Sequence, residues 1–271
     1  MAELHAWKEV QWVSPLITAI IYAIITIVTQ MGHPNDRYLK SFNLSMSETT
    51  SHAYHEDTVS YPLLCGMSAV VWIVYCVVLE YLLQRDAKKF RIHMATLMLG
   101  CLEAVLLTIA VTSAIKTSVG FLRPNFASVC KPILQANGSY VCSVAASEYE
   151  KSMISFPSGH ASTGTAAGFF TTLYALWTLY FRAPAAADRD LSFVRQVCFL
   201  PALAPTLLAL TVSVSRVTDF KHHTIDITMG TLLGLLFASV TFVRVLAAVP
   251  STTSGGDHHL VVGETPLDIQ S

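Results

Sequence analysis

Six stretches of this chain are apolar and long enough to cross a lipid bilayer as helices. A spanning helix needs roughly 17–25 mostly apolar residues, and polar or charged segments separate the six stretches. The pattern therefore predicts an all-α bundle of six transmembrane helices within residues 1–250. The expected helices cover about Trp12–Met31, Tyr61–Leu83, Met94–Ile115, His160–Phe181, Val197–Val214 and Ile225–Val249.

Two of these stretches allow another interpretation. Pro201 and Pro205 interrupt the fifth, but prolines are tolerated in membrane helices. The first resembles a signal peptide, yet its apolar part is long for one, the residues before it are barely basic and no clear cleavage site follows. We therefore predict that both are helices. The Ser/Thr/Gly-rich residues 251–271 are expected to form a disordered cytoplasmic tail.

The composition also favours a membrane protein over a soluble one. Hydrophobic residues make up 53% of the 271 residues and charged residues only 13%, whereas a soluble domain carries about 25% charged residues. The formal net charge of −1 excludes a globally basic protein that binds nucleic acid. A site for an anion must therefore be local. The sequence allows a homo-oligomer but does not determine the oligomeric state.

Basic residues gather in two of the connections between predicted helices and indicate the orientation. They are Arg85, Lys88, Lys89, Arg91, Arg182, Arg189 and Arg195. Positively charged loops remain in the cytoplasm, which places both termini there and the other three loops on the exterior or luminal side. Two of these outer loops contain N-x-S triplets, at Asn43 and Asn137, which are candidate glycosylation sites. Cys130 and Cys142 share one outer loop, where an oxidising compartment would allow a disulfide.

Charged and reactive residues form three clusters, each beside the end of a predicted helix. In chain order they are Lys116 with Arg123; Ser158, Gly159 and His160; and Arg216, His222 and Asp226. The third helix ends, and the fourth begins, on the same side of the membrane as the turn between the fifth and sixth. All three clusters are therefore predicted to face the exterior or the lumen, where they could converge.

The chemistry of these clusters suits a phosphate group. Lysine offers a point charge, and the two arginines offer planar forks that match phosphate oxygens. The start of the fourth helix should add free backbone N–H groups and the positive end of the helix dipole. Ser158 contributes a hydroxyl, and Gly159 lets the backbone approach the ligand closely.

The two histidines are predicted to divide the reaction between them. His222 and Asp226 are four residues apart, so on a helix they share one face. The carboxylate would hold the proton of one ring nitrogen and leave the other nitrogen free to attack phosphorus. His160 would act as general acid and later activate water. Since no cluster of carboxylates suits Mg²⁺, the sequence predicts catalysis without a metal or cofactor.

Each residue also has an ordinary structural interpretation. Lys116 could extend towards the membrane interface, His160 could cap a helix, and one of His222 and His223 could bond only locally. These structural interpretations become improbable when taken together, because all of them would have to apply to residues that lie on one side of the membrane. Glu103, roughly 20 Å deeper than Lys116, is expected to pair within the bundle.

Other polar residues are expected to serve the structure. Asp219 is predicted to hydrogen-bond near Arg216. His33, His52 and His55 lie in the first outer loop at spacings that fit no standard metal site, and a solvated loop is the favoured interpretation.

The clustered residues resemble the signature of the type 2 phosphatidic acid phosphatase family, also called lipid phosphate phosphatases. The matching positions are Lys116 with Arg123-Pro124, then Pro157-Ser158-Gly159-His160, then Ser215-Arg216 with His222 and Asp226. The resemblance implies a helical core shared with vanadium-dependent haloperoxidases. It also implies a phosphohistidine at His222 rather than His223, oriented by Asp226, with His160 as acid and base.

The family resemblance implies an integral-membrane, Mg-independent phosphatase for lipid phosphate monoesters, above all phosphatidate, and also lysophosphatidate. One alternative keeps the chemistry but acts on isoprenoid diphosphates, diacylglycerol pyrophosphate or sphingoid phosphates. Another is a catalytically silent scaffold that binds lipid phosphates, although such relatives typically lose signature residues and none is lost here. A transporter would need two inverted halves with broken helices, and only the fifth predicted helix is interrupted. The sequence does not distinguish the plasma membrane from an endomembrane.

Overall fold

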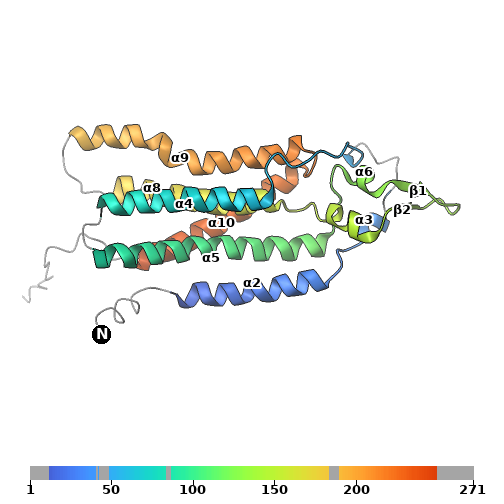
Figure 1. Ribbon diagram of the computed structural model, residues 1–271, viewed down its shortest axis with the longest axis horizontal. Helices are drawn as coiled ribbons and strands as arrows, with labels where there is room; N and C mark the ends of the chain where they lie inside the picture. The colour runs from blue at the N-terminus through green and yellow to red at the C-terminus, as the bar shows by residue number, and fades with distance from the viewer. Residues whose placement is uncertain (1–11, 41, 43–48, 84–86, 183–188, 249–271) are drawn as a thin grey trace, which may run out of the picture.

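Long helices running side by side make up most of the protein (Figure 1). The computed structural model describes residues 12–40, 42, 49–83, 87–182 and 189–248. Asn43 and residues 251–271, which carry predictions of glycosylation and of a disordered tail, lie outside the described residues. The long helices are α2 (Val13–Met31), α4 (Tyr61–Leu83), α5 (Ala87–Val119), α8 (Gly159–Trp177), α9 (Arg189–Thr218) and α10 (Thr224–Ala248).

Four of the described helices are long and apolar enough to cross a membrane, namely α4, α5, α9 and α10. The apolar part of α2 is shorter and covers Val13–Thr29. Helix α8 corresponds to the fourth predicted stretch but is not among the four. The described residues therefore support a multi-pass helical membrane protein, while the predicted count of six spans is not confirmed.

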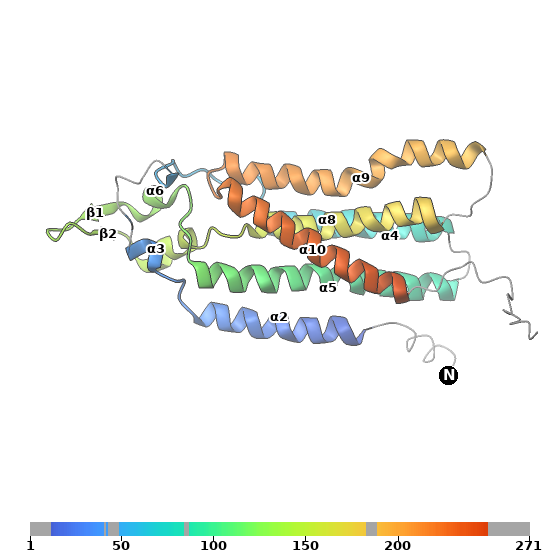
Figure 2. The same cartoon turned by 180° about the vertical axis from the view of Figure 1, so that it is seen from behind.

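Helix α8 differs from the others because it lies inside the bundle. It is buried along most of its length and packs against α4, α5, α9 and α10. Figure 2 shows α10 crossing obliquely over the helices behind it. Small and hydroxylated residues dominate α8, and the Thr171 hydroxyl donates to the Ala167 carbonyl within the helix. A helix enclosed by other helices needs small side chains for close packing rather than an apolar surface for lipid.

Glycines bring the backbones of α8, α9 and α10 into close contact. A β-carbon added at Gly168 of α8 would lie 2.6 Å from the carbonyl oxygen of Pro205 in α9. One added at Gly234 of α10 would lie 2.6 Å from the carbonyl oxygen of Ser162 in α8. The interhelical distances around α8 thus depend on positions that have no side chain.

Two acidic side chains inside the helices are buried and paired. Glu80 of α4 accepts hydrogen bonds from the Tyr174 hydroxyl, at 2.6 Å, and from Arg182. Glu103 of α5 pairs with Arg244 of α10, as expected from its position far from the phosphate-binding clusters. Both pairs tie together helices that are distant in the sequence, and the partners offset the cost of burying a charge.

Two helices are longer than the hydrophobic pattern predicts. Helix α5 begins before the predicted Met94, so Lys88, Lys89 and Arg91 lie in its first turns rather than in a loop. Helix α9 continues through Pro201 and Pro205, with a bend that is visible in Figure 1. A proline removes one backbone hydrogen bond and bends a helix without ending it when neighbouring helices support it.

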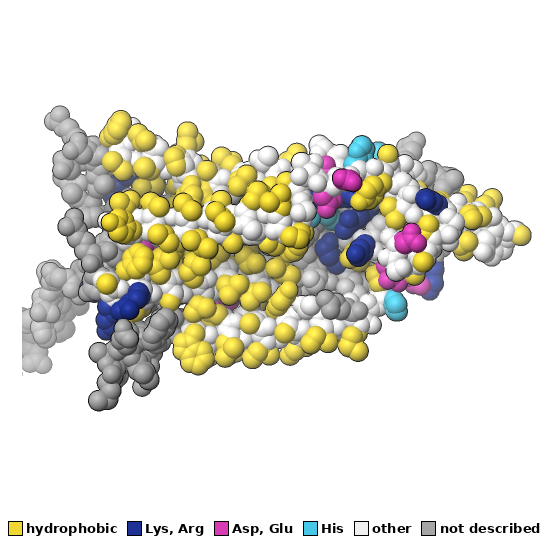
Figure 3. All heavy atoms as spheres, in the orientation of Figure 1, with side chains coloured by type: hydrophobic (Ala, Val, Ile, Leu, Met, Phe, Trp, Pro, Cys, Tyr) yellow, Lys and Arg dark blue, Asp and Glu magenta, His cyan; other side chains and the backbone are white. Residues whose placement is uncertain are grey.

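One end of the bundle carries short elements and most of the exposed polar chemistry, and we call it the site end. It holds α3 (Arg37–Lys40), α6 (Phe126–Cys130), β1 (Pro132–Leu134), β2 (Tyr140–Cys142), α7 (Ala146–Tyr149) and the 3-10 turn Glu150–Met153. Figure 3 shows charged and histidine side chains gathered there, whereas hydrophobic side chains cover the visible face of the helices.

The strands β1 and β2 form a small antiparallel hairpin, which the all-α prediction did not include. Cys130 and Cys142 are joined by a disulfide at its base. Asn137 lies exposed in the turn between the strands, and its side chain accepts a hydrogen bond from the Ser139 hydroxyl.

Substituting Gly234 tests the close packing of α8 and α10. Gly234→Ala should lower the free energy of unfolding by about 1–3 kcal/mol, because the new methyl group meets backbone atoms that cannot move aside. Thermal unfolding in detergent measures the effect. Gly66→Ala is the control, since a β-carbon there meets nothing within 4 Å. Equal unfolding temperatures for the two variants would contradict the packing argument.

Candidate active site

The three sequence clusters come together at the site end. Lys116 lies in the last turns of α5, Ser158 caps α8, and Asp226 lies in the first turn of α10. The backbone N–H of Ser158 donates to the carbonyl oxygen of Asp226 at 2.9 Å, which joins the second cluster to the third. The Lys116 ammonium donates to the carbonyl oxygen of Ile154 at 2.9 Å, which joins the first cluster to the segment that leads into the second.

The start of α8 differs in one respect from the expected anion cradle. The Ser158 N–H is not free, because the Asp226 carbonyl accepts it, while the Ser158 hydroxyl accepts from the N–H of Ala161 at 3.4 Å. The first turn of α8 nevertheless faces Lys116, since a β-carbon added at Gly159 would lie 3.7 Å from the Lys116 Cε. Lys116 is thus directed into the site and does not extend towards the interface.

Arg216 is buried, and its guanidinium is held from two sides. Its Nη1 donates to Asp219 Oδ2 at 3.1 Å and its Nη2 to Asp57 Oδ1 at 2.7 Å. The Nε atoms of Arg216 and of Arg123 are buried and have no hydrogen-bond partner among the described residues. Buried donors are normally satisfied, so these two atoms mark a place where an anion can bind.

Arg123 is held by its backbone in the segment that follows α5. Its N–H donates to the carbonyl oxygen of Ser152 at 2.8 Å. Burial, and then the charge of Arg216, lower the pKa of Arg123 to about 10. The side chain therefore remains charged at neutral pH.

His222 and Asp226 meet, but not in the way the sequence spacing predicts. Helix α10 begins at Thr224, so His222 precedes the helix and does not share a helical face with Asp226. Its Nδ1 still lies 3.5 Å from Asp226 Oδ2. Ser155, which the sequence analysis did not select, donates to the same oxygen at 2.5 Å and lies 3.4 Å from His222 Nδ1. One serine thus contacts both members of the pair.

The neighbouring His223 also approaches Asp226, at 3.4 Å, but its surroundings differ. Its Nε2 lies 3.3 Å from the carbonyl oxygen of Thr49, and 20% of its side chain is exposed. His222 is buried, and its Nε2 has no hydrogen bond to any described residue. The two rings therefore differ in which nitrogen is available to a ligand.

Burial keeps His222 neutral. Desolvation lowers the pKa of His222 well below 6.5; the hydrogen bond to Asp226 opposes this, and the charges of Lys116 and Arg123 add to it. A neutral imidazole whose Nδ1 faces a carboxylate has its Nε2 lone pair available for attack.

Residues 57–59 of the loop before α4, which we call the strap, cross the site, and the sequence analysis did not select them. The backbone N–H and the hydroxyl of Thr58 donate to Asp219, at 2.9 and 2.7 Å. His160 Nε2 lies 3.1 Å from the carbonyl oxygen of Val59. Asp219 is therefore a hydrogen-bonding residue near Arg216, as expected. Nothing in the sequence distinguishes the strap from the rest of a polar loop.

The three histidines between α2 and α4 pack against other side chains. The His52 ring stacks on Phe220 with ring centroids 4.3 Å apart, and His55 lies at 5.5 Å from the same ring. His33 contacts Glu150 at 3.2 Å. Within the described residues, no three side chains of His, Cys, Asp or Glu gather in a group that could hold a metal ion.

Comparison with known proteins points to the same family as the residues gathered at the site. Residues 97–249 match the PAP2 superfamily. Lipid phosphate phosphatase 1 of Arabidopsis thaliana is 36% identical over 148 residues, a match that covers 53% of this chain and 43% of that protein. Phospholipid phosphatase 2 of Bos taurus is 31% identical over 83% of this chain and 78% of that protein. For phospholipid phosphatase 2 of Homo sapiens the identity is 27%, with the same coverage.

The chain therefore belongs to the PAP2 superfamily, and these relatives place it among the phosphatases of that superfamily. No solved structure matches the chain.

Removing the Ser155 hydroxyl should impair the His222–Asp226 pair. One lost hydrogen bond of about 0.5–1.5 kcal/mol predicts that Ser155→Ala lowers the phosphatase kcat roughly 2- to 10-fold. Without the hydrogen bond from Ser155, the Asp226 carboxylate should stabilise the protonated form of the His222 ring more strongly. The pKa of His222 should therefore rise. The acid limb of the pH–rate profile should therefore move to higher pH.

The control is Ser152→Ala, because the buried Ser152 hydroxyl donates only to the Tyr149 carbonyl. A pH–rate profile that moves equally in both variants, or in neither, would contradict the role assigned to Ser155.

Proposed function

We propose that this protein hydrolyses lipid phosphate monoesters, phosphatidate above all, through a phosphohistidine on His222 and without a metal ion. The observation that carries the proposal is that the buried Nε atoms of Arg123 and Arg216, at the site of a neutral His222, have no hydrogen-bond partner among the described residues. An anion at these donors would satisfy both. The names of the relatives support a lipid phosphate or phospholipid as the substrate class.

The proposed reaction has two steps. In the first, His222 Nε2 attacks phosphorus, the bond from phosphorus to the lipid oxygen breaks, and that oxygen takes a proton from His160. In the second, His160 removes a proton from water, which attacks the phosphohistidine and releases inorganic phosphate. Lys116, Arg123 and Arg216 stabilise the phosphoryl oxygens, and Asp226 keeps His222 oriented.

The surroundings of His160 support this role, because one of its ring nitrogens already faces a polar partner. Its Nε2 lies 3.1 Å from the Val59 carbonyl, and its ring meets Tyr61 edge-on at 5.3 Å between centroids. The leaving oxygen would replace the carbonyl as the acceptor of the His160 proton. The ring would keep its orientation because Tyr61 is itself held by a hydrogen bond of 2.9 Å to Thr163.

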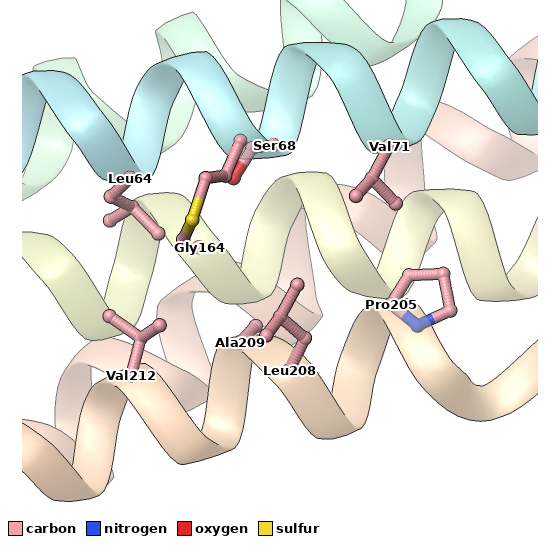
Figure 4. Close-up of a pocket in the computed structure, with 9 residues that line it drawn as sticks. Leu64, Ser68, Val71, Gly164, Pro205, Leu208, Ala209 and Val212 are labelled. Carbon is pink, nitrogen blue, oxygen red and sulfur yellow. The ribbon is translucent and has the colours of Figure 1, made fainter. Parts of the chain in front are cut away.

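An apolar groove supports a lipid as the substrate. It lies between α4 and α9 with α8 at its base (Figure 4). Leu64, Gly164 and Val212 line it, and each is one helical turn from a residue at the site, namely Tyr61, His160 and Arg216. Because most of its lining residues are apolar, the groove would accept part of one acyl chain.

The orientation and the number of spans belong to the same proposal. The basic residues at the end opposite the site favour cytoplasmic termini and a site that faces the exterior or the lumen. With α2 and α8 counted as spans, the bundle has the six helices expected from the sequence. Either the plasma membrane or an endomembrane fits this arrangement.

Replacing each of the adjacent histidines tests the nucleophile. His222→Ala should lower phosphate release from phosphatidate by at least about a thousandfold, because no other group can form the covalent intermediate. His223→Ala should retain most of the activity. The assay is run in mixed micelles with a chelator present. Wild-type activity that requires added Mg²⁺, or a larger loss in His223→Ala than in His222→Ala, would contradict the mechanism.

Filling the groove tests the position of the acyl chain. Ser68→Phe should reduce kcat/KM for long-chain phosphatidate about tenfold or more, because the ring occupies the groove, while a short water-soluble phosphate monoester is cleaved as before. Ala69→Phe is the control, since Ala69 is exposed on the next position of α4. Equal losses on the long-chain and the short substrate would contradict this role of the groove.

A further inference from the structure

The turn between α9 and α10, which carries His222, contains a backbone conformation that a bulky residue rarely adopts. Phe220 has a φ of 53°, in the left-handed region. A side chain makes this region unfavourable, and a bulky residue found there is an exception. Where a helix ends in this conformation, the residue is usually glycine. Such a strained residue persists only where its surroundings hold it in place.

The left-handed residue completes a hydrogen-bond pattern that ends α9. The Phe220 N–H donates to the carbonyl oxygen of Val217 at 3.0 Å. The Lys221 N–H donates to the carbonyl oxygen of Arg216, also at 3.0 Å. These two bonds define a Schellman motif, which closes the end of a helix around one left-handed residue. The His222 N–H donates to the same Arg216 carbonyl at 3.2 Å. The turn thus joins the backbone of His222 directly to that of Arg216.

The ring of His52 stacks on Phe220. The two rings are nearly parallel, with an angle of 5° between their planes and 4.3 Å between their centroids. His55 approaches the same ring less closely, at 5.5 Å and with a tilt of 44°. His55 is exposed, whereas His52 is partly buried. A close stack of two rings fixes one relative to the other, so His52 is the neighbour that restrains Phe220.

The backbone of His52 is itself tied to another part of the site. Its N–H donates to the carbonyl oxygen of Pro124 at 3.0 Å. Two residues earlier, the Thr50 carbonyl accepts from the N–H of Ala127 at 2.9 Å. Pro124 follows Arg123 in the chain. The stack therefore connects the segment that carries Arg123 to the turn that carries the proposed nucleophile.

We propose that His52 is a positioning residue, which holds the turn that directs His222 at the phosphate by stacking on Phe220. The inference rests on the proposed function, because it takes His222 as the nucleophile. The role requires a flat ring at position 52 and no proton transfer. It also requires His52 only as long as residue 220 is strained, since glycine adopts the left-handed conformation without that strain.

Replacing the ring tests the stack. His52→Ala should lower kcat for phosphatidate about tenfold and change KM less than twofold, because the turn loosens while the cationic side chains that bind phosphate remain. His52→Phe should restore at least half of the wild-type kcat, since it keeps a ring and has no proton to transfer. His55→Ala is the matched control and should keep the wild-type kcat, because His55 touches the same ring without stacking on it.

A double-mutant cycle tests whether His52 acts through Phe220. In a Phe220→Gly background, adding His52→Ala should change kcat less than twofold. Phe220→Asn serves if the glycine variant does not fold, because asparagine also ends helices in the left-handed conformation. An equal cost of His52→Ala in both backgrounds, or no recovery of kcat in His52→Phe, would overturn the inference while leaving the phosphatase function intact.

Hydrogen exchange supplies a second readout that does not depend on activity. In His52→Ala the backbone amides of Lys221 and His222 should exchange about tenfold faster than in the wild type, because the turn opens more often. Added to Phe220→Gly, the same substitution should leave their exchange unchanged. Unchanged exchange in His52→Ala alone would overturn the inference. Failure of the wild-type protein to release phosphate from phosphatidate would instead overturn the proposed function, and exchange would still show whether His52 holds the turn.

Discussion

The burial of Arg216 at the end of the helical bundle is the constraint on which the site depends. A buried guanidinium is costly unless its donors are satisfied, and here Asp57, Asp219 and the Val59 carbonyl satisfy the Nη atoms. These partners come from the loop before α4 and from the end of α9. The need to pair one cation therefore draws an otherwise irregular loop across the site and leaves the Nε donor for a ligand.

The same principle acts inside the bundle. Glu80 and Glu103 connect distant helices through buried ion pairs, and glycines allow α9 and α10 to approach α8. Helix α8 is thereby held rigidly at the centre, and its first turn presents Ser158 and His160 beside Lys116 and Asp226. A site built at the ends of packed helices can hold its groups in fixed positions.

Much of this could be predicted from the sequence. Long apolar stretches predicted the helices, and α4 has the bounds that the pattern indicated. The predicted positions of the helix ends were less accurate. Helices α5 and α9 extend through charged residues and prolines, whose interactions depend on neighbouring helices. The sequence analysis also did not predict that α8 is enclosed by other helices, because a hydrophobic pattern cannot distinguish a helix that faces lipid from one enclosed by protein.

For the site, the sequence by itself determined which residue types are available and that they lie near the ends of helices on one side. It also determined the family signature, since residue identity and spacing are local properties of the chain. Only the tertiary structure decided that Ser155 joins His222 to Asp226, that His223 turns towards Thr49, and that Asp57 reaches Arg216 across 159 positions of the chain. These contacts arise because buried charges select partners by proximity in the folded state, which no local pattern records.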